Sequence, residues 1–283
     1  MADWIRDFIA GQVATSPENS LADGSGERAF DQPLVGFSAG DDPLYQEYRR
    51  HIGDFFWTPA QAHALAFPDD PAPASELTVI SWILPQTQAT KDENAGQNIY
   101  CSRRWAAVRL FGEKFNALLR RELAQALCDR GVPACAPMLL PQWKMEISPA
   151  YNFASTWSER HAAHTAGLGT FGLCDGLITP LGKAMRVGSV IVRARLEPTA
   201  RPYADHHAYC LFFSHGTCGK CIPRCPVGAL SEKGHDKNKC SRHVRVAGKE
   251  HNQREFGLEI EGCGLCQVAV PCASHIPAPE EGL

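Results

Sequence analysis

The segment Cys218-Gly-Lys-Cys221-Ile-Pro-Arg-Cys225-Pro226 decides how the last quarter of this 283-residue chain folds. A second run, Cys263-Gly-Leu-Cys266, repeats its opening pair farther along. Cysteine pairs separated by two residues, with another cysteine directly before proline, are typical of iron–sulfur ligation. Eight cysteines gather in this region: Cys210, Cys218, Cys221, Cys225, Cys240, Cys263, Cys266 and Cys272. Two 4Fe–4S clusters require eight thiolates, so this part of the chain is predicted to move electrons.

The spacing also predicts which cysteines share a cluster. Cys218 and Cys221 lie in one tight turn, whereas Cys225, fixed by Pro226, points toward the other cluster, as in two-cluster bacterial ferredoxins. The two expected sets are Cys210, Cys218, Cys221 and Cys272 for one cluster, and Cys225, Cys240, Cys263 and Cys266 for the other. His215 stands where a plain motif has its first cysteine, so it remains an alternative ligand to Cys210.

Zinc is the alternative occupant, because paired cysteines also hold structural zinc ions. The cysteine before Pro226 and the interleaved spacing favour iron–sulfur. The remaining cysteines share no ligand spacing and are interpreted as small buried hydrophobic residues: Cys101, Cys128, Cys135 and Cys174. Because thiols stay reduced in a reducing compartment, a disulfide scaffold is not expected.

Composition and charge narrow the function classes. The chain is 44% hydrophobic and 21% charged, which is typical of a globular protein, and its net charge of −3 gives no overall attraction to nucleic acid or membrane. No stretch is apolar enough to span a bilayer, and the first residues carry acids where a secretion signal would be basic. We therefore expect a cytoplasmic protein with no membrane or nucleic-acid partner.

Basic residues outnumber acidic ones between Lys220 and Arg254. One interpretation is that they form a docking face for an acidic electron donor or for RNA. The other is that they solvate a small domain and offset the negative charge of the clusters. The second interpretation is favoured. A ferredoxin- or flavodoxin-type protein is the expected electron donor.

Hydrophobic periodicity predicts alternating helices and strands before the cysteine-rich region. The expected elements are helices over residues 1–10, over 102–130 and from Thr156, and strands over 77–84, 177–179 and 187–192. Thr156 and Glu159 have the spacing of a capping box. This alternation predicts an α/β layer domain over residues 1–200 and a cluster domain over 201–283, with the boundary near Pro198–Pro202.

Several segments are similar to those of epoxyqueuosine reductases and of corrinoid-dependent reductive dehalogenases. They include Ser158–Gly169 with its Ala-Gly-Leu-Gly ending, Leu177–Gly182, Arg186–Val190 and Gly216–Ala229. The resemblance implies an α+β, nitroreductase-like corrinoid-binding layer domain followed by a ferredoxin-like domain with two 4Fe–4S clusters. It also implies that electrons pass through the clusters to a cobalamin, which carries out the reduction.

Six residues are assigned to the corrinoid by the resemblance alone. Gly167, Leu168 and Gly169 would let the backbone approach the corrin ring, and Thr179, Arg186 and Gly188 would lie near its rim. From the residues themselves, a helix C-cap followed by a turn explains Gly167 and Gly169 equally well.

A reductive step also needs a proton donor. The reductases of this family place an aspartate shortly before the pair that corresponds to Glu159-Arg160, but this chain has none between Asp129 and Asp175. The available substitutes are Tyr151, His161 and His164. Each is also explained as a packing or capping residue.

Three functions follow in order of preference. The first is an iron–sulfur oxidoreductase that passes electrons to a bound corrinoid for reduction of a small organic substrate. The second is an electron-transfer protein or reductive activator of a separate corrinoid protein, which the missing aspartate favours. The third is a zinc-stabilised binding protein.

Overall fold

A four-stranded antiparallel sheet forms the centre of the computed structural model, which describes residues 1–22 and 24–282. The strand order is β1-β2-β8-β3, and its members are β1 (Leu34–Ala39), β2 (Thr78–Pro85), β8 (Met185–Val192) and β3 (Ala134–Cys135). Every residue of β2 is buried, because β1 and β8 flank it and helices cover both faces of the sheet. The predicted strands over 77–84 and 187–192 are confirmed.

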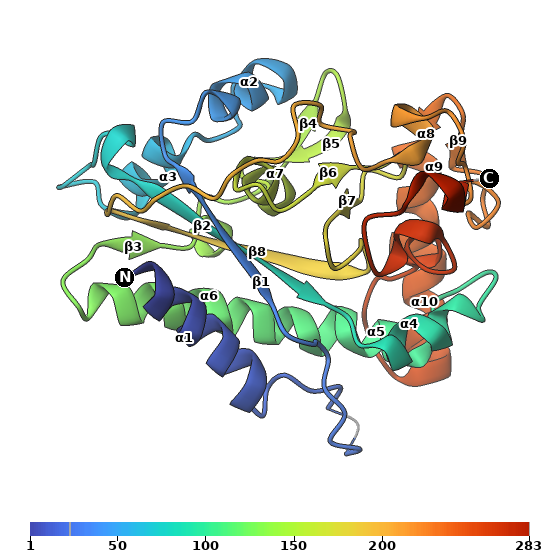
Figure 1. Ribbon diagram of the computed structural model, residues 1–283. Coiled ribbons are helices and arrows are strands. Elements are labelled where there is room, and N and C mark those ends of the chain that lie inside the picture. The colour runs from blue at the N-terminus through green and yellow to red at the C-terminus, as the bar shows by residue number, and fades with distance from the viewer. Residues whose placement is uncertain (23, 283) are drawn as a thin grey trace.

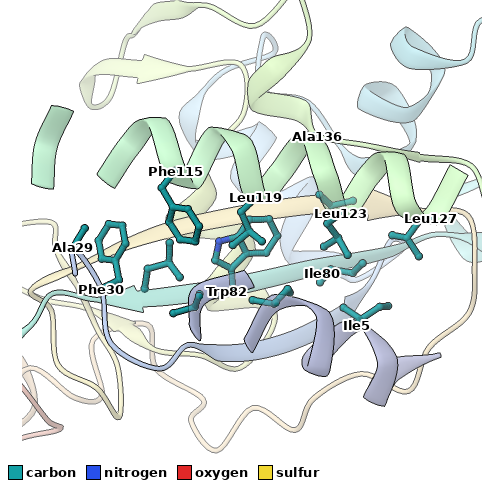
Figure 2. Packing of buried hydrophobic residues seen from close by; sticks show 14 of the residues in the cluster. Ile5, Ala29, Phe30, Ile80, Trp82, Phe115, Leu119, Leu123, Leu127 and Ala136 are labelled. Atoms are coloured by element: carbon teal, nitrogen blue, oxygen red, sulfur yellow. The ribbon is translucent and has the colours of Figure 1, made fainter. Parts of the chain in front are cut away.

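One face of the sheet is covered by α1 (Ala2–Thr15) and α6 (Glu113–Cys128) (Figure 1). The apolar positions of α6 recur at helical spacing, so its side chains reach the sheet from one side of the helix. Trp82 of β2 lies beneath α6 (Figure 2). Its indole nitrogen donates to Oδ1 of Asn116 at 2.9 Å. The predicted helices over 1–10 and 102–130 are confirmed, and the first is longer than expected.

The predicted helix over 102–130 contains a wider turn near its start. It consists of α5 (Arg103–Ala107), a π-helical segment η2 (Val108–Gly112) and α6. A π segment inserts an extra residue per turn and often lies at functional sites. Gly131, whose φ is +75°, ends the helix as the sequence predicts.

The opposite face of the sheet carries α2 (Pro43–Ile52), α3 (Pro59–Ala66) and α7 (Glu159–Thr165) (Figure 1). The predicted capping box at the start of α7 is wrong. The helix begins at Glu159, and its N-cap Ser158 makes no side-chain hydrogen bond to the backbone. Thr156 Oγ1 instead accepts from the Lys144 amide, and Glu159 is committed to buried partners in the interior.

Short elements complete the first two thirds of the chain. They are α4 (Gln88–Ala95), η1 (Ala74–Glu76), η3 (Pro137–Leu139), the hairpin β4 (Met145–Ser148) with β5 (Asn152–Ser155), and the pair β6 (Thr170–Phe171) with β7 (Leu177–Ile178). A turn in which Thr179 and Gly182 form an isolated bridge joins β7 to β8, as the sequence predicts.

The cysteine-rich region packs at the end of the sheet where β2 finishes and β8 begins (Figure 1). Its elements are α8 (Leu211–Ser214), β9 (Leu230–Ser231), β10 (Gly234–His235), α9 (Lys237–Arg242), a π segment η4 (His243–Ala247), α10 (Gly248–Phe256), η5 (Leu265–Gln267), η6 (Pro271–Ala273) and η7 (Pro279–Gly282). The amides of Lys183 and Ala184 donate to the carbonyls of Cys272 and Ala273, which ties this region to the turn before β8.

The fold is a mixed α/β arrangement, as predicted, with the sheet wholly antiparallel. The expected boundary near Pro198–Pro202 falls in a stretch without helix or strand, and the division into two domains stays a prediction. None of the helices formed by the described residues has the length and apolar character needed to cross a membrane.

Gly188 of β8 tests how tightly this sheet packs. A Cβ there would overlap the indole of Trp82, so Gly188→Ala is expected to lower the free energy of unfolding by about 1–3 kcal/mol. Urea denaturation measures the change. Gly96→Ala is the control, because its Cβ would have no neighbour closer than Glu93 O at 3.6 Å. Equal effects of the two substitutions would contradict the packing described.

Candidate functional site

The eight C-terminal cysteines line two cavities beside the sheet. The smaller one, here called the outer cavity, is lined by Cys210, Cys218, Cys221 and Cys272. The larger one, here called the main cavity, has a volume of about 620 Å³ and is lined by Cys225, Cys240, Cys263 and Cys266. Each cavity therefore has the four cysteines that the spacing assigns to one cluster. All eight thiols are free.

Local backbone structure holds these cysteines toward the cavities. Cys225 lies in a turn whose Ala229 amide donates to its sulfur at 3.2 Å. Gly264, which follows Cys263, has a φ of +69° and lies against the Trp105 indole, where a Cβ would overlap the ring. Glycine is required there both for the backbone conformation and for the close approach.

The described residues, 1–22 and 24–282, contain no group of three or more His, Cys, Asp or Glu side chains placed to hold a single metal ion. A zinc site gathers four ligands around one ion. The thiolates of a 4Fe–4S cluster stand farther apart, because each binds a different iron. Each of the two cavities provides four cysteine side chains, which is the number that one 4Fe–4S cluster requires.

The wall of the main cavity formed by the N-terminal region carries a buried ionic network. Arg120 is only 2% exposed, and its guanidinium donates to Glu159 at 2.9 Å, to Glu113 at 3.0 Å and to the Val187 carbonyl at 2.9 Å. Ser189 donates to the second oxygen of Glu159. Burial alone would lower the pKa of Arg120, but the two carboxylates outweigh it and hold that pKa above its ordinary value.

Glu159 is fully committed within this network. Burial raises the pKa of its carboxyl group, while Arg120 and Ser189 oppose that rise. Both of its oxygens accept a hydrogen bond from the chain, so the carboxylate fixes the position of Arg120.

Arg186 is the member of this wall with an unused donor. Its Nε is buried and has no hydrogen-bond partner, and the nearest carboxylate oxygen, Glu113 Oε2, is 3.7 Å away. Burial, followed by the nearby charge of Arg109, lowers the pKa of Arg186 to about 9, so it remains a cation at neutral pH. Its guanidinium can therefore donate to an oxygen of a molecule in the cavity.

The two π segments each contribute a side chain to the lining of the main cavity. Arg109 comes from η2 and donates to the Glu261 carbonyl at 3.3 Å. His243 comes from η4, and its ring nitrogen bonds the Ile99 carbonyl at 2.9 Å. Three indoles, from Trp105, Trp143 and Trp157, add apolar surface.

Five of the six residues assigned to a corrinoid do not line the main cavity. Gly167 has a φ of +76° and caps α7, and a Cβ on it would lie 2.5 Å from the Ala200 carbonyl. A Cβ on Gly169 would overlap the Ile178 carbonyl, and Leu168 is 2% exposed in a hydrophobic cluster. These three residues contact the chain itself, which is the capping interpretation that the sequence left open.

Thr179 and Gly188 also have internal roles. Thr179 is fully buried and donates to the Gly182 carbonyl at 2.7 Å within the turn before β8. Gly188 makes room for Trp82, as described above. Arg186 is therefore the one predicted corrinoid contact that the described structure places on the cavity wall.

The three predicted proton donors do not line the main cavity either. Tyr151 is 47% exposed, with the Lys237 ammonium 5.6 Å from its ring centre. His161 bonds Ser158 at 2.7 Å and packs edge-on against Tyr48, and burial lowers its pKa to about 3. His164 bonds the Gly169 carbonyl at 2.7 Å. Packing and local hydrogen bonds explain the placements of His161 and His164, whereas Tyr151 lies at the surface.

Sequence reasoning missed the ionic network, because Arg120 and Glu159 come from different helices and have no diagnostic spacing. It also missed the environment of Cys174. That thiol is buried beside Cys266, with the Lys183 ammonium 3.5 Å from its sulfur. Cys174 and Lys183 lie in two different turns, and no sequence pattern indicates that the two side chains are in contact.

The chain is similar to epoxyqueuosine reductases, as its motifs indicate. It is 33% identical over 119 residues to one from Bacillus anthracis, and this alignment covers 40% of this chain and 29% of the relative. It is 30% identical over 129 residues to one from Gloeobacter violaceus, and that alignment covers 43% of this chain and 38% of the relative. The matches thus span well under half of the length of these curated relatives. No protein-family model matches the chain.

Solved structures of reductive dehalogenases share the fold. A catabolic reductive dehalogenase in complex with 3-bromo-4-hydroxybenzoic acid aligns with a TM-score of 0.52 at 17% identity, over 99% of this chain and 38% of that one. A reductive dehalogenase associated with B12-dependent dehalogenation aligns with a TM-score of 0.50 at 18% identity, over 88% and 30%.

Arg120 provides a test of the ionic network. Arg120→Met leaves Glu159 buried without its cation, so the free energy of unfolding should fall by about 3–5 kcal/mol. Chemical denaturation measures the loss. Arg121→Met, on the exposed side of the same helix, should change stability by no more than about 0.5 kcal/mol. A loss at position 120 as small as that at 121 would show that the pair is not buried as described.

Proposed function

We propose that this chain is an iron–sulfur reductase that passes electrons through two 4Fe–4S clusters to a small organic substrate in the main cavity. One observation carries the proposal: four cysteines of one predicted cluster and the buried ionic network line the same cavity. A volume of about 620 Å³ is within the range of small-molecule sites. Relatives named as reductases support the assignment to the oxidoreductases.

The clusters supply one-electron transfer when they are bound. Cys225, Cys240, Cys263 and Cys266 would hold the cluster nearer the substrate, because they line the main cavity. The cysteines of the outer cavity would hold the cluster that receives electrons first. A ferredoxin- or flavodoxin-type protein is the proposed donor.

The ionic wall would bind and protonate the substrate. Arg186 offers its unused Nε to a carbonyl, carboxylate or hydroxyl oxygen, and Arg109 adds a second cation nearby. Glu113 is 37% exposed and lies beside Arg186, so we assign to its carboxylate the transfer of the proton that accompanies the electrons: it takes a proton from solvent and passes it to the substrate. Glu159 keeps Arg120 in place and so fixes the wall behind them.

The finer hypothesis, in which a bound corrinoid receives the electrons, is supported by the relatives, one of which is associated with B12-dependent dehalogenation. The residues expected to form the corrin cradle do not fit this role, because five of the six pack against the chain itself. No step proposed here therefore runs through a corrinoid. Titration with cobalamin decides the matter: a spectral change that is lost in Arg186→Gln would place a corrinoid in the main cavity.

The assignment of the cysteines predicts that each iron–sulfur cluster can be removed without the other. Anaerobically purified protein should contain iron and sulfide for two clusters, and Cys263→Ser and Cys218→Ser should each remove one of them, because they belong to different cavities. Iron analysis and electron paramagnetic resonance measure the result. Cys128→Ser, outside both cavities, should keep both clusters. Zinc in place of iron, or no metal, would refute the proposal.

The rate at which substrate reoxidises the reduced clusters tests the role of Glu113 in proton transfer. After chemical reduction, they should be reoxidised by a substrate from a panel of epoxides and halogenated aromatic acids, and Glu113→Gln should slow that reaction by about 10²–10⁴-fold. Stopped-flow absorbance follows the reoxidation. Glu122→Gln, farther along the same helix, is the control. Equal rates for the wild type and Glu113→Gln would remove Glu113 from the mechanism.

A further inference from the structure

Lys183 lies between the two cavities. It occupies the turn that joins β7 to β8, its side chain lines both the main cavity and the outer cavity, and it is only 3% exposed. Its amide donates to the Cys272 carbonyl at 3.0 Å, so the backbone fixes it directly to the cysteine-rich region.

The surroundings of the Lys183 ammonium are rich in sulfur. Its Nζ donates to the Cys174 sulfur at 3.5 Å. The other groups that act on its charge most strongly are the thiols of Cys272 and Cys221 from the outer cavity and of Cys266 from the main cavity. Across residues 1–22 and 24–282, no carboxylate forms an ion pair with it.

A buried ammonium needs a compensating negative charge. Lys183 lines the cavities of both predicted clusters, so the cluster thiolates would supply that charge when iron is bound. A 4Fe–4S cluster with four thiolate ligands is an anion, and its negative charge increases by one on reduction. A fixed cation nearby therefore stabilises the reduced cluster more than the oxidised one.

We propose that Lys183 is a counter-cation shared by the two clusters and that it raises the reduction potential of both. This inference rests on the proposed function, since it requires both clusters. In the step concerned, one electron enters a cluster, no covalent bond forms or breaks, and Lys183 keeps its proton. Lys183 is thus a tuning residue, and it need not touch the substrate.

The test is a redox titration of both clusters, followed by electron paramagnetic resonance, in wild type and in Lys183→Met. Methionine keeps an unbranched side chain and removes the charge. Both midpoint potentials should become more negative, so that at the wild-type midpoint the ratio of reduced to oxidised cluster falls about tenfold or more. Unchanged potentials, or a shift in one cluster alone, would overturn the proposal.

Two further variants separate charge from packing. Lys183→Arg keeps the cation and should keep potentials close to those of the wild type. Lys91→Met is the matched control, because Lys91 also reaches the cysteine-rich region, donating to Ser274 at 2.9 Å, but lines neither cavity. Its potentials should not move. If Lys183→Met and Lys183→Arg both lose their clusters, the lysine is a packing residue and the proposal is wrong. A wild type without clusters would instead refute the proposed function.

Discussion

Buried charge has to be compensated, and the end of the sheet where β2 finishes and β8 begins concentrates charge of both signs. Arg120 is balanced there by Glu113 and Glu159, whereas Arg186 keeps a buried donor without an acceptor. Lys183 is buried with its ammonium 3.5 Å from the Cys174 sulfur, and it lines the cavities of both sets of cluster cysteines. Isolated ions cost several kcal/mol when they leave water, so this arrangement indicates anionic groups that complete the site. Cluster thiolates and a substrate oxygen are the groups that fit.

The fold makes such a concentration of charge possible. The fully buried strand β2 and the Trp82 core beneath α6 provide a rigid apolar base. The π segments η2 and η4 place Arg109 and His243 on the wall of the main cavity. The hydrogen bonds from Lys183 and Ala184 to the η6 segment hold Cys272 of the outer cavity beside the turn before β8. Apolar packing therefore fixes the positions of groups that repel one another or lack partners.

The sequence predicts the strands and long helices well, because their apolar periodicity has a simple physical cause in one-sided burial. It also groups the eight cysteines as the cavities do, since spacing within a turn limits which thiolates can share a cluster. It fails where contacts are formed between distant segments. The capping box predicted at Thr156 is wrong because α7 begins at Glu159, whose carboxylate binds Arg120 from another helix. The glycines of the Ala-Gly-Leu-Gly segment resemble a cofactor cradle in sequence, yet neighbouring backbone fills the space beside them.

The proposed electron transfer requires iron in both cavities, and anomalous X-ray diffraction from anaerobically grown crystals tests this requirement most directly. Data recorded on either side of the iron absorption edge should show two separate iron centres. One should lie among Cys210, Cys218, Cys221 and Cys272, and the other among Cys225, Cys240, Cys263 and Cys266. Anomalous signal at the zinc edge instead, or iron in neither cavity, would contradict it.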